Sequence, residues 1–377
     1  MAGIYLHIPF CKTRCIYCDF YSTTHSEWRS RYIQTLCCEL EMRSEYLKRE
    51  PVETIYLGGG TPSQLTEEDF MLIFDTIERN FGMEHCCEIT LEANPDDLTI
   101  DYLQMLAKLP FNRISMGIQT FNDTILRLLK RRHNATQAIE AVQRCREVGF
   151  QNISIDLIYG LPGETIESWE NDLQQTLNLN VEHISAYHLI YEEGTPIYNM
   201  LQKHQINEID ENTSVQFFSL LIKRLSESGY EHYEISNFCK SEKYAQHNTS
   251  YWKGIPYLGC GPSAHSYNLS AREWNISSIE SYMKGVEEGK RPFETEMLDP
   301  ITRYNEFIIT SLRTMWGIPL KRMKDEFGME RWQYCMKLAA PYLENKKLEI
   351  KDDALCLTKE GIFISDSIMS DLLFVEE

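Results

Sequence analysis

The sequence has no long apolar run, no excess of basic residues and no internal repeat. No apolar stretch approaches the roughly 20 residues that a membrane-spanning helix needs. The first residues lack the basic, apolar and small segments of a secretory signal, so we expect none. The chain has 37 Lys and Arg residues against 56 Asp and Glu residues, a formal net charge of −19. Because nucleic-acid backbones bind to basic surfaces, this balance disfavours a nucleic-acid partner.

Disulfide bonds are also not expected, although the chain has 12 cysteines. Without a secretory signal, so many thiols indicate a reducing compartment, and we expect a cytoplasmic protein whose cysteines are free or metal-bound. The 377 residues, 43% of them hydrophobic and 25% charged, have the composition of an ordinary globular protein. The length allows two domains, or one barrel with an appended part.

Short apolar segments alternate with helical patterns through the first 230 residues. Alternation of this kind predicts βαβ units and a parallel sheet. Six strands favour an open or partial barrel over a complete barrel of eight strands. The expected strands are residues 4–9, 52–57, 87–92, 113–119, 152–159 and 183–190.

The rhythm changes after about residue 230, where helical patterns follow one another. Residues 231–238 are expected to form a strand, and residues 348–350 and 354–357 a terminal hairpin. Helices followed by a hairpin resemble a winged-helix arrangement. We therefore expect an α/β fold, with a TIM-like partial (β/α)6 barrel over residues 1–230 and an α+β, winged-helix-like domain over residues 231–377.

Three cysteines, Cys11, Cys15 and Cys18, lie on one short loop after the first expected strand. The C-x3-C-x2-C spacing allows three thiolates to hold three corners of a four-iron cluster. One iron then stays open for chemistry, much as a catalytic zinc keeps a free position. A partial zinc knuckle and three unrelated thiols are the alternatives. Zinc normally needs a fourth Cys or His close by, and the next candidate is His25.

Polar residues follow several of the other strands. Gly58, Gly59 and Gly60 come directly after the second strand, where free backbone amides could approach a ligand. Each feature alone is equally typical of a tight turn or of a satisfied buried polar group. Ligands of parallel α/β folds collect at the carboxyl ends of strands. Together with the cysteine loop, one set of residues forms a coherent polar ring: Glu92, Gln119 and Asp156.

These motifs resemble the radical S-adenosylmethionine (SAM) superfamily. The cysteine spacing, with Tyr17 before Cys18, matches its cluster signature, and Gly58 to Pro62 matches its motif for the amino group of methionine. Residues 5–11, 115–119 and 156–162 are similar to the coproporphyrinogen-oxidase-like branch. The resemblance extends from about residue 4 to the end of the chain, and it implies a radical SAM barrel.

The resemblance implies that Cys11, Cys15 and Cys18 hold a [4Fe–4S] cluster whose open iron chelates SAM. An electron from the cluster then cleaves the sulfonium to a 5′-deoxyadenosyl radical. By resemblance Glu92 accepts from the ammonium, Arg131 pairs with the carboxylate, and Tyr17 flanks the cluster. The implied SAM-binding residues are Tyr5, Gly59, Gly60, Thr61, Glu92, Gln119, Arg131 and Asp156, the last of these holding the ribose hydroxyls.

Two departures separate this chain from the active oxidases of that branch. The oxidases carry a further cysteine where this chain has Phe20, and an N-terminal extension for which Cys11 leaves no room. Both departures point to the HemW-type heme chaperones. Their H-N-x-x-Y-W motif is matched by residues 247–252. The candidate heme residues are therefore His247, Asn248, Tyr251 and Trp252, with His265 and Cys260 as rival ligands of the iron.

We therefore expect a heme chaperone that carries a cluster and SAM and transfers heme, its cargo, to heme-requiring membrane proteins such as a respiratory oxidase subunit. One alternative is an oxygen-independent coproporphyrinogen III oxidase of porphyrin biosynthesis, so whether the chain is an enzyme stays open. A second is a radical enzyme acting on RNA, which the acidic charge disfavours. Homodimer formation and transient membrane association also stay open.

Overall fold

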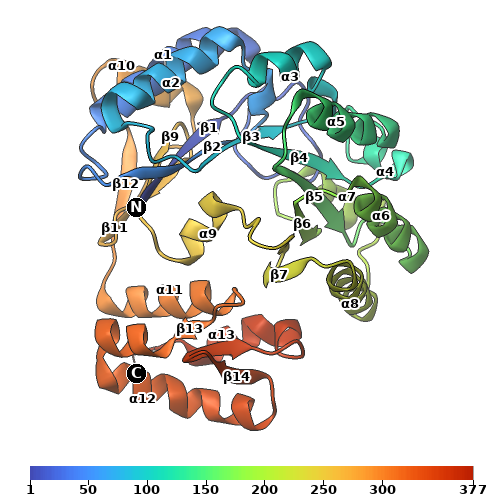
Figure 1. Ribbon diagram of the computed structural model, residues 1–377, viewed down its shortest axis with the longest axis vertical. Helices are drawn as coiled ribbons and strands as arrows, with labels where there is room; N and C mark the ends of the chain where they lie inside the picture. The colour runs from blue at the N-terminus through green and yellow to red at the C-terminus, as the bar shows by residue number, and fades with distance from the viewer. Residues whose placement is uncertain (377) are drawn as a thin grey trace.

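The computed structural model describes residues 1–376, and its centre is a sheet of parallel strands (Figure 1). Adjacent strands pair in the order of the sequence, each parallel to the next. The prediction of six parallel strands in a partial barrel is confirmed. The strands are β1 (Ala2–Ile8), β2 (Val52–Gly59), β3 (Glu88–Ala93), β4 (Arg113–Gln119), β5 (Ile153–Tyr159) and β6 (His183–His188).

Helices between these strands cover the outer face of the sheet (Figure 1). Thr66 begins one of them with a capping box, in which its side chain accepts from the backbone N–H of Asp69 and the Asp69 side chain accepts in return. Their apolar faces bury residues such as Leu36 and Phe70 against the strands. The helices are α1 (Arg29–Met42), α2 (Glu67–Phe81), α3 (Ile100–Leu106), α4 (Asp123–Leu128), α5 (Ala135–Val148), α6 (Ile166–Leu179), α7 (Pro196–Gln202) and α8 (Glu211–Glu227).

The sheet continues at both edges into a 12-stranded sheet. At one edge the expected strand 231–238 proves to be two antiparallel strands, and that expectation was wrong in this detail. The chain turns at Ser236, whose N–H donates to the Glu234 carboxylate. The added elements are β7 (Glu231–Glu234), β8 (Asn237–Cys239), α9 (Gln246–Trp252), β9 (Tyr257–Cys260), β10 (His265–Tyr267), β11 (Ala271–Asn275), α10 (Ile279–Glu287) and β12 (Phe293–Met297).

The last part of the chain forms a separate core below the barrel (Figure 1). Its three strands pair in the order β13-β15-β14, and the expected terminal hairpin is confirmed. Gly328 interrupts the longest helix with a positive φ of 81°. The elements are α11 (Pro300–Leu312), β13 (Ile318–Pro319), α12 (Leu320–Glu344), β14 (Leu348–Lys351), β15 (Ala354–Leu357) and α13 (Ser365–Leu372).

The α/β class with an appended C-terminal domain is thus confirmed. The division at residues 230 and 231 stays a prediction. Because β7 to β12 pair with the barrel sheet, we propose that residues 231–297 belong with the barrel and that the C-terminal domain begins at about residue 298. Within residues 1–376, no helix combines the length and the apolar character needed to cross a membrane.

A buried carboxylate, that of Glu39 on α1, ties the added strands to the barrel. It accepts hydrogen bonds from the Tyr282 hydroxyl at 2.6 Å, the Gly261 N–H at 2.8 Å and the Asn275 amide at 2.8 Å. Arg43, one helical turn further on, lies 3.3 Å away as its counterion. A buried charge is tolerated only where it is paired and fully hydrogen-bonded, as here. This network therefore fixes β9 to β11 and α10 against α1.

Candidate functional site

A cavity of about 430 Å³ lies at the carboxyl ends of the parallel strands. The loop after β1 brings Cys11, Cys15 and Cys18 to its wall, so the three predicted cluster ligands share one cavity. We call this the cluster cavity.

Two hydrogen-bond donors face the cysteine sulfurs. The Thr61 hydroxyl donates to Cys11 Sγ at 3.4 Å, and Arg131 Nη1 donates to Cys15 Sγ at 3.4 Å. Burial raises the pKa of the Cys18 thiol to about 11, so without a metal this thiol stays protonated. Iron binding would displace the proton, and Thr61 and Arg131 would then stabilise thiolates. The donor set fits an iron–sulfur cluster.

Arg131 is fixed by the residues around it. Its Nη2 donates to Asn94 Oδ1 at 2.5 Å and to the Gly117 carbonyl at 2.6 Å. Its Nε is buried and has no hydrogen-bond partner among residues 1–376. A buried donor without a partner marks a place where a ligand acceptor is missing. An anionic group of a ligand would satisfy it.

Two buried carboxylates, Glu92 and Asp156, line the same cavity. Glu92 accepts from the Tyr56 hydroxyl at 2.7 Å and from the Gly59 N–H at 3.0 Å. Burial, reinforced by Asp156, raises the pKa of Glu92 to about 7, and burial raises the pKa of Asp156 to about 6. A cationic ligand would favour their charged forms, because an opposite charge lowers a carboxyl pKa. The cavity therefore suits a ligand with both cationic and anionic groups.

Gln119, at the end of β4, has a left-handed backbone with φ of 72°. The register of β4 against β5 shifts between Gly117 and Gln119, so the strand carries a bulge there. A left-handed backbone is uncommon for residues other than glycine and asparagine. Residues with such strained backbones are found preferentially at functional sites. The bulge places Gln119 in the wall of the cluster cavity.

The structure brings nearly all the predicted SAM residues together. Tyr5 is the exception, because it does not line the cavity among the described residues. Its ring lies behind Tyr56, with the centroids 6.2 Å apart, and its hydroxyl lies 3.1 Å from His7 Nδ1. The residues that do line the cavity, with the three cysteines, are Tyr17, Gly59, Gly60, Thr61, Glu92, Gln119, Arg131 and Asp156.

Our sequence reasoning missed a group of inward-facing polar residues on β4 to β6. These residues could have been found from the alternation of side chains along each strand, which places every second residue on the same face of the sheet. Ser115 precedes Gln119 at this spacing, and Ser154 precedes Asp156. The missed lining residues are Arg113, Ser115, Ser154, Ser185 and Tyr187.

His247, the first residue of the H-N-x-x-Y-W motif, is buried in α9. Its Nδ1 lies 2.8 Å from Thr54 Oγ1 and its Nε2 lies 2.7 Å from the Tyr251 hydroxyl. Burial lowers the pKa of His247 to about 3, so the imidazole is neutral. Both ring nitrogens are therefore engaged within the protein, and ligation of a metal would require one of these bonds to break.

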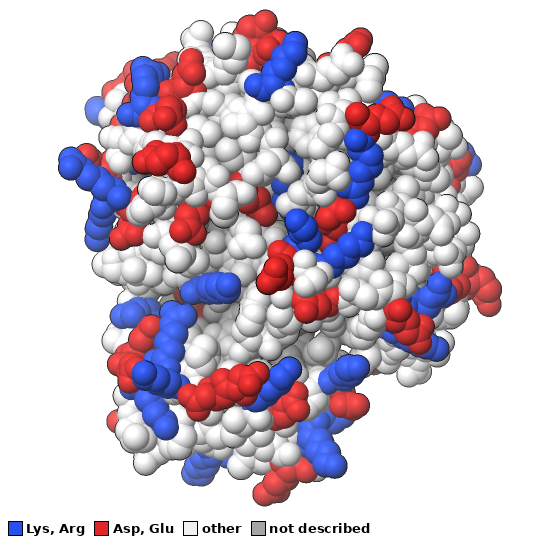
Figure 2. Space-filling model, in the orientation of Figure 1, with Lys and Arg blue, Asp and Glu red and all other residues white. Residues whose placement is uncertain are grey.

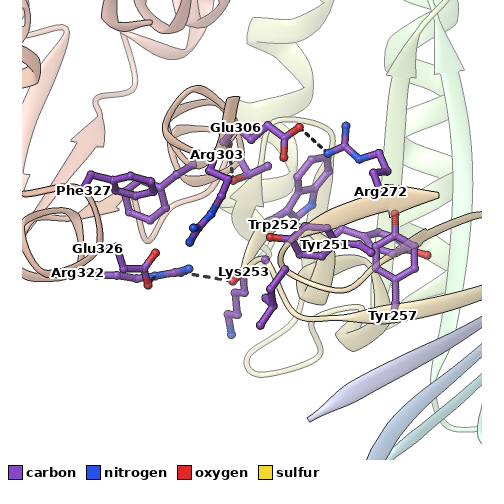
Figure 3. Close-up of a pocket in the computed structure, with 15 residues that line it drawn as sticks. Tyr251, Trp252, Lys253, Tyr257, Arg272, Arg303, Glu306, Arg322, Glu326 and Phe327 are labelled. Atoms are coloured by element: carbon purple, nitrogen blue, oxygen red, sulfur yellow. Dashed lines mark hydrogen bonds and ion pairs between the residues drawn. The ribbon is translucent and has the colours of Figure 1, made fainter. Parts of the chain in front are cut away.

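Three other residues of the motif line two different cavities. Asn248 lines the cluster cavity, whereas Tyr251 and Trp252 line a second cavity of about 350 Å³. This second cavity lies between α9, the strands that follow it, and helices α11 and α12 (Figure 3). We call it the junction cavity. The rival ligands His265 and Cys260 line neither cavity: His265 stacks on Trp274, and Cys260 is buried in β9.

The chain is similar to known proteins over its whole length. A family model described as the radical SAM superfamily matches residues 5–176, and one described as the HemN C-terminal domain matches residues 298–364. Heme chaperone HemW of Bacillus subtilis (strain 168) is 32% identical, over 99% of both chains. Heme chaperone HemW of Lactococcus lactis subsp. lactis (strain IL1403) is 31% identical, over 98% of this chain and 96% of that protein.

A solved structure shares the fold. Coproporphyrinogen III oxidase (HemN) from Escherichia coli, described as a radical SAM enzyme, superposes with a TM-score of 0.85. The match covers 98% of this chain and 89% of that chain at 23% identity. At this identity the likeness establishes a common architecture, and fold alone does not fix function.

Replacing one cluster cysteine tests the assignment of the cluster cavity. After anaerobic reconstitution, Cys15→Ala should lose most of its iron and sulfide, because a cluster with two protein thiolates is poorly held. Cys38→Ala is the matched control, since Cys38 is exposed on α1 and lies outside the cavity. Iron and acid-labile sulfide are measured per chain. Equal contents in wild type and Cys15→Ala would refute the assignment.

Proposed function

The chain belongs to the HemW family of heme chaperones within the radical SAM superfamily, and we propose that it binds heme as cargo and delivers it to heme-requiring proteins. One observation carries the proposal beyond family membership. Helix α9, which holds the H-N-x-x-Y-W motif, contributes residues to both the cluster cavity and the junction cavity. In this proposal a cofactor site and a cargo site meet on one helix.

In this proposal the cluster cavity holds the cofactors. Cys11, Cys15 and Cys18 would hold a [4Fe–4S] cluster, and when bound, the cluster and SAM supply one-electron chemistry. The Glu92 carboxylate, already oriented by Tyr56 and Gly59, would accept from the ammonium of SAM. The buried Nε of Arg131 would donate to an anionic group of the ligand, and Asp156 would accept from ribose hydroxyls.

We propose that Tyr251 and Trp252 contact the heme, while His247 positions Tyr251 through its hydrogen bond at 2.7 Å. The identity of the axial ligand stays a prediction, with His247, His265 and Cys260 as the candidates named from the sequence. For the recipient we propose a heme-requiring membrane protein such as a respiratory oxidase subunit. The chain itself would be cytoplasmic, associating transiently with the membrane, and a homodimer is compatible with this role.

SAM binding should depend on pH through Glu92. Its pKa of about 7 means that the carboxyl is half protonated near neutrality and loses its attraction for an ammonium below that pH. SAM affinity, measured by equilibrium dialysis with the reconstituted protein, should fall about tenfold from pH 8 to pH 6. Glu92→Gln should bind weakly at both pH values, with most of the dependence removed. An unchanged pH profile in Glu92→Gln would contradict the role of this carboxylate.

The proposed delivery of heme is tested by measuring the transfer of hemin from this protein to an acceptor protein. Protein loaded with hemin is mixed with the apo form of a heme-requiring respiratory subunit in detergent, and the acceptor spectrum is followed. A chaperone should transfer hemin at a rate that rises with acceptor concentration, because transfer occurs within a complex rather than by release into solution. An unrelated acidic protein incubated with hemin is the control. Hemin affinity no better than that of the control would refute the proposal.

A further inference from the structure

The junction cavity combines positive charge with aromatic rings. Its lining comes from the end of α9, from β9 to β11 and from two helices of the C-terminal domain (Figure 3). Tyr251, Trp252, Tyr257, Tyr267, Phe307 and Phe327 supply the rings. Flat aromatic faces of this kind suit a planar apolar ligand.

Two of the basic residues at the cavity are neutralised by acidic neighbours. Arg272 Nη2 lies 2.8 Å from Glu306 Oε1, and Arg322 Nε lies 2.7 Å from Glu326 Oε1. These pairs hold α11 to β11 and stiffen the start of α12. They leave the charge of Arg272 and Arg322 compensated within the protein.

Arg303 and Lys253 are different, because neither forms an ion pair with any of residues 1–376. Figure 3 shows the Arg303 side chain reaching from α11 into the space between Arg322 and Trp252. Lys253 is directed elsewhere, because its Nζ lies 4.7 Å from the centroid of the Trp316 ring and Trp316 does not line this cavity. In a chain of net charge −19, the unpaired guanidinium of Arg303 favours an anionic ligand at this cavity.

An orphaned donor lies in the same wall. Trp252 Nε1 is buried and has no hydrogen-bond partner among residues 1–376. Buried indole N–H groups normally find an acceptor, so this one has its partner missing. Arg303 is exposed, so its guanidinium is accessible to a ligand from solvent. Figure 2 shows basic side chains gathered where the C-terminal domain meets the barrel.

Building on the proposed heme function, we propose that the junction cavity is the heme-carboxylate site: Arg303 pairs with a propionate, and the surrounding aromatic rings cover one edge of the macrocycle. A volume of about 350 Å³ is at the lower end of ligand cavities, so part of the macrocycle stays exposed. Partial exposure is what a protein that passes its ligand on requires. The site draws on both parts of the chain, since Trp252 ends α9 and Arg303 lies on α11.

The test compares hemin with hemin dimethyl ester, in which both carboxylates are masked. Both are titrated by absorbance into the full-length, cluster-reconstituted protein. Wild type should bind hemin at least tenfold more tightly than the ester, because charge-assisted pairs with the carboxylates are lost in the ester. Arg303→Gln should weaken hemin binding about tenfold and leave ester binding unchanged. Lys321→Gln removes one exposed charge from α12 outside the cavity and should change neither.

The possible results distinguish failure of the heme-carboxylate site from failure of the proposed heme function. Equal binding of hemin and ester by wild type, or full hemin affinity in Arg303→Gln, would overturn the heme-carboxylate site while heme binding stood. Equal losses in Arg303→Gln and Lys321→Gln would reduce the effect to long-range charge and also overturn it. Failure of wild type to bind hemin at all would overturn the proposed function, and the site with it.

Discussion

The carboxylate of Glu88 fixes the helix on which both cavities depend. It accepts from the backbone N–H of Gln246 and of His247, each at 2.9 Å, at the start of α9. Glu88 is buried, with Arg113 Nε 3.7 Å away. A buried carboxylate at the amino end of a helix gains from the unpaired N–H groups there. The interaction holds α9 against the barrel, so that Asn248 reaches the cluster cavity while residues one turn later reach the junction cavity.

A series of direct contacts connects the two cavities. Tyr251, in the wall of the junction cavity, hydrogen-bonds His247, and His247 hydrogen-bonds Thr54 on β2. Strand β2 ends at Gly59, whose N–H binds Glu92 in the cluster cavity. Because His247 is neutral and both its nitrogens are engaged, it acts as a fixed spacer in this series. The arrangement gives the motif a structural reason for its histidine that differs from metal ligation.

The barrel was predicted from local patterns, whereas most of the proposed cofactor residues were named through the resemblance to the radical SAM superfamily. Apolar runs located the six strands, and strand ends located Glu92, Gln119 and Asp156. Contacts between distant segments could not be predicted from the sequence. For example, β9 pairs with β1 although more than two hundred residues separate them, and no local pattern indicates that pairing. Tyr5 was expected beside SAM and lies behind Tyr56. The junction cavity was missed altogether, since Trp252 and Arg303 meet only after the C-terminal domain has packed.

We propose that this oxidase-like fold handles heme and does not decarboxylate a porphyrinogen. Phe20, with 64% of its surface exposed, lines the cluster cavity at the position where the resemblance implies a cysteine in the active oxidases. Its ring offers no thiol for ligation or proton transfer. The most direct measurement is anaerobic turnover of coproporphyrinogen III by the reconstituted protein with SAM and a reductant, beside a known oxidase. The account predicts no decarboxylated product while the oxidase control works, and product at turnover would contradict it.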